Sequence, residues 1–239
     1  MQSKGKAIVL STLRYKENDL IVKCYTNERG VVSYLQKGVL KSKRSKTKAV
    51  FFQPLMLLEI EENYMPGRSL QFLKEVGSYI PLKSLHTNVL KASLSVFIAE
   101  VLSTVLKEEE ADLELFTFIE TAIQFLDMSG NFANFHLLFL LRLTKHLGFY
   151  PDNTKDDYPY FNLESGSFEV EKSSLYAIEG QLKTQFKQLL DSDFSTVDQI
   201  KLNITERRDL LKTLLVYFEL HLGNFKKPKS LQVFIDVFQ

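Results

Sequence analysis

A run of basic residues between two strand-like segments is the first feature of the sequence that could do chemistry. The segment 37–48 reads KGVLKSKRSKTK, and it contains no acidic residue and six cations, namely Lys37, Lys41, Lys43, Arg44, Lys46 and Lys48. Cations crowded on one polar segment repel each other, and the backbone of a nucleic acid is the commonest anionic partner that offsets this repulsion. The segment therefore predicts a nucleic-acid-binding loop. The alternative is a solvated loop that keeps a sheet edge soluble.

Motifs for catalysis or metal binding are missing from the sequence. It contains no Gly-rich phosphate loop, no G-x-S-x-G and no H-E-x-x-H. The four histidines are scattered, and the single cysteine, Cys24, can form neither an intramolecular disulfide nor a multi-cysteine zinc site. We therefore expect a protein without enzymatic activity, metal or cofactor, and a nuclease is the least supported alternative.

Charge is distributed unevenly along the 239 residues. Residues 1–80 carry 14 Lys and Arg against 7 Asp and Glu, whereas the remainder carries 16 against 22. A basic front and an acidic back favour two domains with different partners. No apolar run approaches the roughly 18–20 residues of a membrane span, and the first residues lack the apolar stretch of a signal peptide. We expect a cytoplasmic protein.

Short apolar runs separated by turn residues dominate the first 80 residues. The predicted strands cover residues 7–13, 20–26, 31–35, 54–62 and 70–76. Gly30 suits a hairpin turn, and Met65-Pro66-Gly67-Arg68 has proline and glycine where a type II turn needs them. Five short strands with one long loop fit a small closed or nearly closed barrel. Such a barrel is an OB-fold, an architecture that often binds single strands.

Beyond Pro81 the apolar period changes from that of strands to that of helices. The predicted helices cover residues 94–106, 113–128, 134–147, 173–190 and 203–222, and YFNLESGSFEV in 150–170 can form a small hairpin. The fold class is α+β multidomain. A five-stranded OB-fold β-barrel in residues 1–80 precedes an all-helical bundle domain in residues 81–239, in which 150–170 is an irregular insert.

Two further groups of side chains are placed to contact a nucleic acid. Arg14 and Arg68 lie near the ends of predicted strands, where they can flank a groove beside the basic loop. Tyr15, Tyr34 and Tyr64 are candidates for stacking on bases, although a strand tyrosine is more often a core residue.

The order of these motifs resembles the RecO family of bacterial recombination mediators. The similarity begins with KAIVLSTLRYKENDLIVKCYTNERGVVSYLQKGVLKSKRSK, in which two strands, their turns and the basic stretch follow in the family's order. FQPLMLLEIEENYMPGRSLQFLKE is similar to the next block, LRLTKHLGFYPD to the central helix and its exit, and HLGNFKKPKSLQVF to the C-terminal segment. The resemblance covers nearly the whole chain and depends on order and spacing, because no single motif is diagnostic.

The resemblance implies a DNA repair protein of the RecFOR recombination pathway. It implies binding of single- and double-stranded DNA, annealing of complementary strands, and contacts with RecR and with the acidic C-terminal tail of single-strand binding protein. The implied outcome is loading of RecA, on DNA in the cytoplasm and the nucleoid.

The segment after the central helix departs from the family's pattern. Many members carry a four-cysteine zinc site there, whereas residues 149–170 contain no cysteine. If the local fold is kept, packing of Tyr158, Tyr160, Phe161 and Phe168 must replace the metal.

Two cations on the central helix are candidates for binding the acidic tail peptide. Arg142 and Lys145 are three residues apart, so they share a helix face, and they interrupt an otherwise apolar run. The alternative is that Arg142 forms an internal salt bridge with a helix carboxylate such as Glu100 or Glu120, because a buried arginine is normally paired.

Two other functions remain open from the residues themselves. An RNA- or ribosome-associated OB-fold protein would carry the same basic barrel. A protein-interaction scaffold would use the helical domain and keep the basic loop only for solubility.

Overall fold

The computed structural model describes residues 2–41, 49–108 and 110–238. Contacts divide the chain into two compact units. Unit 1 comprises residues 1–128 and 228–234, and unit 2 comprises residues 129–227 and 235–239. The predicted domain limits, 1–80 and 81–239, stay a prediction, because grouping by contacts describes packing and not independent folding.

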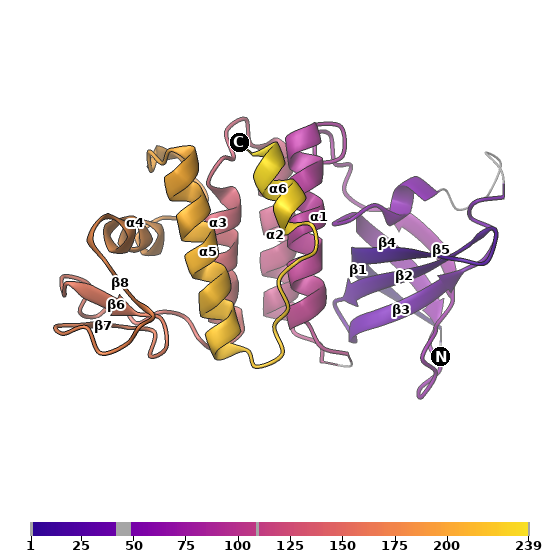
Figure 1. Cartoon of the computed structure of the whole chain (residues 1–239). Coiled ribbons are helices and arrows are strands. Elements are labelled where there is room, and N and C mark those ends of the chain that lie inside the picture. The colour runs from indigo at the N-terminus through magenta and orange to yellow at the C-terminus, as the bar shows by residue number, and fades with distance from the viewer. Residues whose placement is uncertain (1, 42–48, 109, 239) are drawn as a thin grey trace. The chain divides into compact units, whose positions relative to one another are not determined.

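Five antiparallel strands form the curved sheet of unit 1 (Figure 1). They are β1 (Gln2–Tyr15), β2 (Asp19–Thr26), β3 (Gly30–Gln36), β4 (Leu57–Asn63) and β5 (Leu73–Ser78), in the order β3-β2-β1-β4-β5. Alternate side chains point inward, as Val22, Cys24 and Tyr34 do, and form a buried core within the sheet. The predicted five-stranded N-terminal fold is confirmed.

The two edges of this sheet meet at Gln71. The backbone N–H of Leu35 on β3 donates to the carbonyl of Gln71 at 2.9 Å, and the N–H of Gln71 donates to the carbonyl of Ser33 at 2.9 Å. The neighbour of β3 on its outer edge is therefore the segment that leads into β5. The result is OB-like and partly open, joined at this point rather than along a full ladder.

Glycines fix two of the turns in this sheet. In the predicted type II turn, the N–H of Arg68 donates to the carbonyl of Met65 at 3.2 Å, and Gly67 has a φ of 76°. Gly30 has a φ of 65°, and a Cβ at this position would lie 2.6 Å from the carbonyl oxygen of Glu110. No larger residue fits at Gly30 without displacing the backbone.

Two helices pack beside the sheet within unit 1. They are α1 (Val89–Val105), capped by the side chain of Asn88, and α2 (Leu113–Met128). Tyr25 of β2 contacts Phe116 with 5.8 Å between the ring centroids, so the outer surface of the sheet is covered at this end. The C-terminal helix α6 (Leu231–Val237) places Phe234 in a stack on Phe97, with centroids 4.6 Å apart.

Unit 2 is built around the predicted central helix. Of the twelve residues of α3 (Phe135–His146), nine are buried, as expected from its nearly continuous apolar sequence. Around it lie α4 (Gly180–Leu190), the 3-10 turn η2 (Val197–Gln199) and α5 (Ile204–His221). The predicted capping box of α5 is present, because the N–H of Glu206 donates to Asn203 Oδ1 and the N–H of Asn203 donates to Glu206 Oε2.

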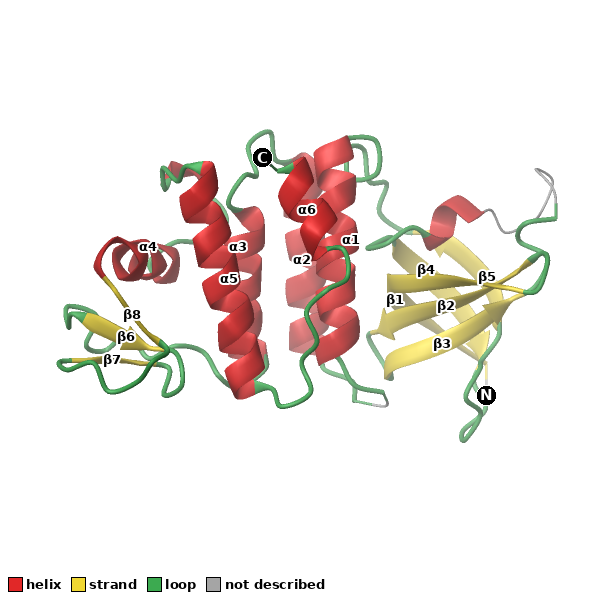
Figure 2. Ribbon diagram, viewed as in Figure 1, coloured by secondary structure: helices red, strands yellow, loops and turns green. Residues whose placement is uncertain are grey.

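A small second sheet spans the segment predicted as an irregular insert, 150–170, and the beginning of the segment predicted as a helix from residue 173 (Figure 2). Strands β6 (Tyr160–Asn162) and β7 (Ser167–Glu169) form the predicted hairpin, and β8 (Ala177–Glu179) pairs with the other side of β6. The helix expected over 173–190 therefore begins only at Gly180. Glu179 is in extended conformation and paired with Tyr160, and Gly180 has a φ of 62°. The helix α6 was not predicted.

Candidate nucleic-acid interface

Four cations of unit 1 lie at the end of the sheet where β1 turns into β2 and β3 ends, and a fifth, Arg68, lies in the turn between β4 and β5. We call them the basic rim: Arg14, Lys16, Lys37, Lys41 and Arg68, all exposed. Two hydrogen bonds hold the turn beside the segment after β3. The N–H of Gly38 donates to Asp19 Oδ1 at 2.8 Å, and the N–H of Leu40 donates to the carbonyl of Asn18 at 3.1 Å. The predicted site residues Lys43, Arg44, Lys46 and Lys48 lie outside the described residues.

Lys37 and Arg68 converge on one aromatic ring. Lys37 Nζ lies 5.6 Å from the centroid of Phe72, and the Arg68 guanidinium lies 4.7 Å from the same centroid. A cation over an aromatic face is attracted by the ring quadrupole and keeps its outward donors available. Sequence reasoning missed Phe72, although its position four residues after Arg68 of the Pro-Gly turn was a usable signal.

An apolar strip crosses the outer surface of three strands next to the rim. Leu13, Ile21 and Leu35 are opposite one another in register on β1, β2 and β3. Leu13 is 64% exposed. Tyr15, two residues further along β1, is 38% exposed. An apolar strip bordered by cations offers bases a surface to pack on and phosphates a set of charges to pair with.

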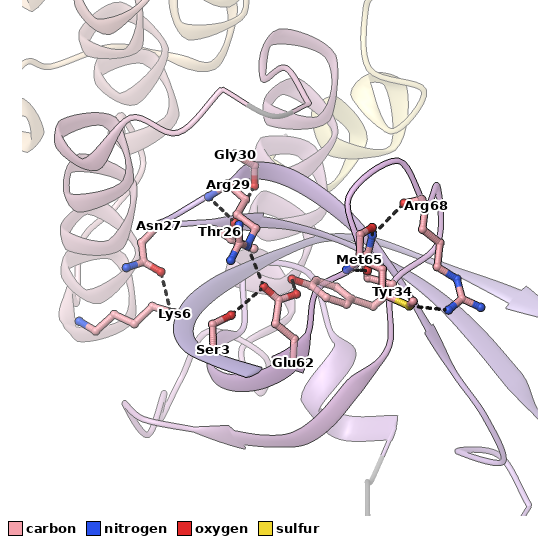
Figure 3. Close-up of polar contacts among 11 residues, drawn as sticks. Ser3, Lys6, Thr26, Asn27, Arg29, Gly30, Tyr34, Glu62, Met65 and Arg68 are labelled. Atoms are coloured by element: carbon pink, nitrogen blue, oxygen red, sulfur yellow. Dashed lines mark hydrogen bonds and ion pairs between the residues drawn. The ribbon is translucent and has the colours of Figure 1, made fainter. Parts of the chain in front are cut away.

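One predicted stacking residue is part of the interior. Tyr34 is fully buried, and its hydroxyl donates to Glu62 Oε2 at 2.9 Å (Figure 3). Burial and the nearby Glu62 carboxylate raise the pKa of Tyr34 far above its ordinary value, so the hydroxyl stays protonated as a donor. The suggestion that Tyr34 stacks on bases is therefore wrong.

The third tyrosine, Tyr64, lies above this buried network. Arg29 Nε donates to Glu62 Oε1 at 3.1 Å (Figure 3). The Arg29 guanidinium lies 4.2 Å from the centroid of Tyr64. Because Glu62 is only 4% exposed, Arg29 neutralises a buried charge and does not belong to the rim.

In unit 2, the two cations of the central helix differ in their surroundings. Arg142 Nη1 donates to the hydroxyl of Tyr150 at 2.8 Å, and Nη2 donates to the carbonyls of Leu190 and Ser192 at the end of α4. These acceptors are a phenol and two carbonyls instead of the carboxylates considered above. Lys145 is exposed. A partner-binding role for the pair stays a prediction.

Glu100 and Glu120, the carboxylates considered for Arg142, have partners within unit 1. Glu100 accepts hydrogen bonds from the backbone N–H and hydroxyl of Ser230 at 2.8 and 2.7 Å. Glu120 accepts from Lys6 Nζ at 3.0 Å and from the hydroxyl of Tyr79.

Aromatic packing and a polar network hold the small sheet of unit 2. Phe161 is fully buried and lies 4.8 Å from Phe168 and 4.7 Å from Phe186, measured between centroids. Asn162 Nδ2 donates to Glu169 Oε1 and to Ser173 Oγ, both at 3.0 Å. Phe161 and Phe168 thus pack as predicted, whereas Tyr158 and Tyr160 are partly exposed.

The described part of the chain was also searched for metal and membrane features. Within it, no three His, Cys, Asp or Glu side chains lie close enough to hold a metal ion. Among the helices that the structure describes, none combines the length and the apolar character needed to cross a bilayer.

A partly open OB-like sheet whose basic, aromatic-bearing rim faces solvent defines the class of OB-fold nucleic-acid-binding proteins. Comparison with known proteins is more specific. Residues 1–79 match the family model "Recombination protein O N terminal", and residues 86–232 match "Recombination protein O C terminal". The chain belongs to the RecO family of DNA repair proteins, with a general role in DNA repair and recombination.

Individual relatives extend this similarity over the full length. The DNA repair protein RecO of Christiangramia forsetii is 46% identical over 233 residues, covering 98% of both chains. The proteins of the same name from Flavobacterium psychrophilum and Flavobacterium johnsoniae are 43% and 39% identical, covering all of both chains.

Proposed function

We propose that this protein is a recombination mediator that binds single- and double-stranded DNA and anneals complementary strands. The observation that carries the proposal is the convergence of Lys37 and Arg68 on Phe72 at the end of an OB-like sheet. Phosphate contacts from such a rim bind without reading sequence, which is what annealing of arbitrary strands requires.

Annealing makes and breaks no covalent bond, so the proposed activity needs no catalytic group. The protein lowers the repulsion between two polyanions by replacing their counterions with its own cations. Bases that rest on the apolar strip of Leu13, Ile21 and Leu35 keep their pairing edges available to a second strand. The protein acts without enzymatic chemistry in this proposal.

The proposal includes three protein partners, in line with the family. RecR and the acidic tail of single-strand binding protein bind directly, and RecA loading on coated single strands is the result. The helical unit 2 takes the tail, with the exposed Lys145 as a cation for its carboxylates. Such a protein works in the cytoplasm, on the DNA of the nucleoid.

A strand-annealing assay tests the proposal. Complementary oligonucleotides are coated with single-strand binding protein, and duplex formation is followed with and without this protein. We expect faster annealing, which a variant lacking the charges of Lys41, Lys43, Arg44 and Lys46 loses. Unchanged annealing rates on coated DNA would contradict the proposal. Preferential binding to structured RNA over both forms of DNA would instead support an RNA-associated function.

A further inference from the structure

A cleft lies between the edge of β3 and the turn that joins β4 to β5. It has a volume of about 240 Å³, and its lining includes Ser33, Tyr64, Arg68, Gln71 and Glu108. This is smaller than the roughly 300–1,000 Å³ of sites for drug-sized ligands. The cleft therefore suits a compact group, such as one planar heterocycle, and Tyr64 supplies an aromatic wall.

The backbone beside the cleft is already engaged on both sides, which excludes an added β-strand. Gln71 bonds to Ser33 and Leu35 on one side, and on the other the N–H of Val31 donates to the carbonyl of Lys107 at 3.1 Å. The stretch of β3 edge between these two contacts is too short for an extended peptide, because such a peptide needs a row of unpaired backbone groups along the edge. The ligand must be a compact group that projects from a chain passing outside.

Ser33 offers this group a fixed donor. The N–H and C=O of one strand residue point the same way, and the C=O of Ser33 points toward Gln71, away from β2. The N–H of Ser33 therefore also points to the side of the cleft.

Glu108 gives the cleft a carboxylate in addition to the cation of Arg68. Its backbone is held against β3 by bridges to Gly30 and Val31, and the residue is exposed at the rim of the cleft. A carboxylate repels phosphate but accepts a hydrogen bond from an amino group, as from N4 of cytosine. Arg68, which lines the same cleft and whose guanidinium bonds to the sulfur of Met65 (Figure 3), is the cation for the adjoining phosphate.

We propose that this cleft binds one unpaired nucleobase that carries an exocyclic amino group, with its strand following the basic rim. The ring lies against Tyr64, the amino group donates to Glu108, and the Ser33 N–H donates to a ring acceptor. The inference deepens the proposed function and rests on it. It assigns to the protein a preference among single strands that phosphate contacts alone cannot produce.

Oligodeoxycytidine and oligodeoxyuridine of equal length are the matched probes, because their bases differ only at C4, an amino group against a carbonyl, and at N3, an acceptor against a donor. Fluorescence anisotropy of the full-length protein should show about tenfold to hundredfold tighter binding of the cytidine strand, the value of one net hydrogen bond to a charged group. In Glu108→Gln the preference should become much smaller, because an amide both accepts from an amino group and donates to a carbonyl.

Glu110→Gln is the control, because it removes the same charge only two residues after Glu108. The Glu110 side chain is exposed and pairs with Lys107. It should keep the cytidine preference. Arg68→Gln should weaken both strands equally. Equal affinity of the wild-type protein for the two strands, with binding of mixed-sequence single strands intact, would overturn the base pocket and leave the proposed function standing. Failure to bind any single strand would overturn both.

Discussion

Arg68 in unit 1 and Arg142 in unit 2 each lie beside an aromatic ring, and the comparison shows what separates a binding cation from a structural one. The Arg68 guanidinium is 4.7 Å from the centroid of Phe72, and that of Arg142 is 5.7 Å from the centroid of Tyr150. Arg142 also donates hydrogen bonds to one phenol and two carbonyls. Arg68 instead donates to a thioether sulfur, which is a weak acceptor. The ring contact alone does not assign a role.

The difference teaches that the acceptors around a guanidinium decide what its loss costs. Removing an arginine that bonds to internal carbonyls leaves those acceptors without a donor and lowers stability. Removing an arginine that faces solvent leaves the fold unchanged and costs only the interactions made with a ligand. The four predictions below test this division between exposed and enclosed side chains.

The largest effect is expected from the cations of the basic segment 37–48. Changing Lys41, Lys43, Arg44 and Lys46 together to glutamine should remove up to four phosphate contacts. The slope of log K against log salt concentration for DNA should then flatten by up to about 3–4 units. The double variant Lys4→Gln/Lys74→Gln is the control, because both lysines pair with Glu61 outside the rim. An unchanged slope in the fourfold variant would show that these four residues do not contact the DNA phosphates.

The second largest effect is expected from Arg142→Ala, which tests the arginine whose acceptors are internal. The loss of charge-assisted bonds to Tyr150, Leu190 and Ser192 should lower the free energy of unfolding by about 3 kcal/mol. A thermal melt and a denaturant titration measure this loss. Lys145→Ala, on the same helix but exposed, should change stability by less than about 0.5 kcal/mol.

Titration with the tail peptide of single-strand binding protein completes this test. If Arg142 is structural, its variant keeps the affinity per folded molecule, and Lys145→Ala weakens binding. A stable Arg142→Ala protein that no longer binds the peptide would reverse the assignment and make Arg142 the receptor for the tail.

Much of the fold could be predicted because its signals are local. The Pro-Gly turn at 65–68, the glycine at position 30 and the capping pair Asn203 and Glu206 all appear in the structure at the expected positions. Each acts within four residues, through backbone conformation or a short-range hydrogen bond. The buried central helix was equally predictable, because apolar residues fill most of its positions and interruptions such as Arg142 and Lys145 are few.

The parts that could not be predicted depend on contacts between distant residues. β3 reads GVVSYLQ and has apolar residues on both faces, so alternation does not reveal that Tyr34 points inward while Leu35 points outward. The convergence of Lys37 and Arg68 on Phe72 requires the sheet edges to meet at Gln71. No local pattern encodes that closure.

Arg68→Gln should give a smaller effect than the loop variant and no loss of stability. One phosphate contact fewer reduces the salt slope by about 1, and the exposed position predicts an unchanged melt. The contrasting variant is Arg29→Gln, which leaves the buried Glu62 without its cation and should cost about 3–5 kcal/mol. If Arg68→Gln lowers stability as much as Arg29→Gln does, the division between the two arginines fails.

The smallest expected effect, no change at all, concerns metal removal from unit 2. The small sheet is held by Phe161 against Phe168 and Phe186, and by the bonds from Asn162 to Glu169 and Ser173. None of these contacts depends on an ion, so a chelator should leave the melting temperature unchanged, and elemental analysis should find no stoichiometric zinc. Phe161→Leu is the positive control, because shortening a buried ring leaves a cavity and should lower the melting temperature. A melt that falls with chelator and recovers with zinc would mean that a metal, and not this packing, holds the segment together.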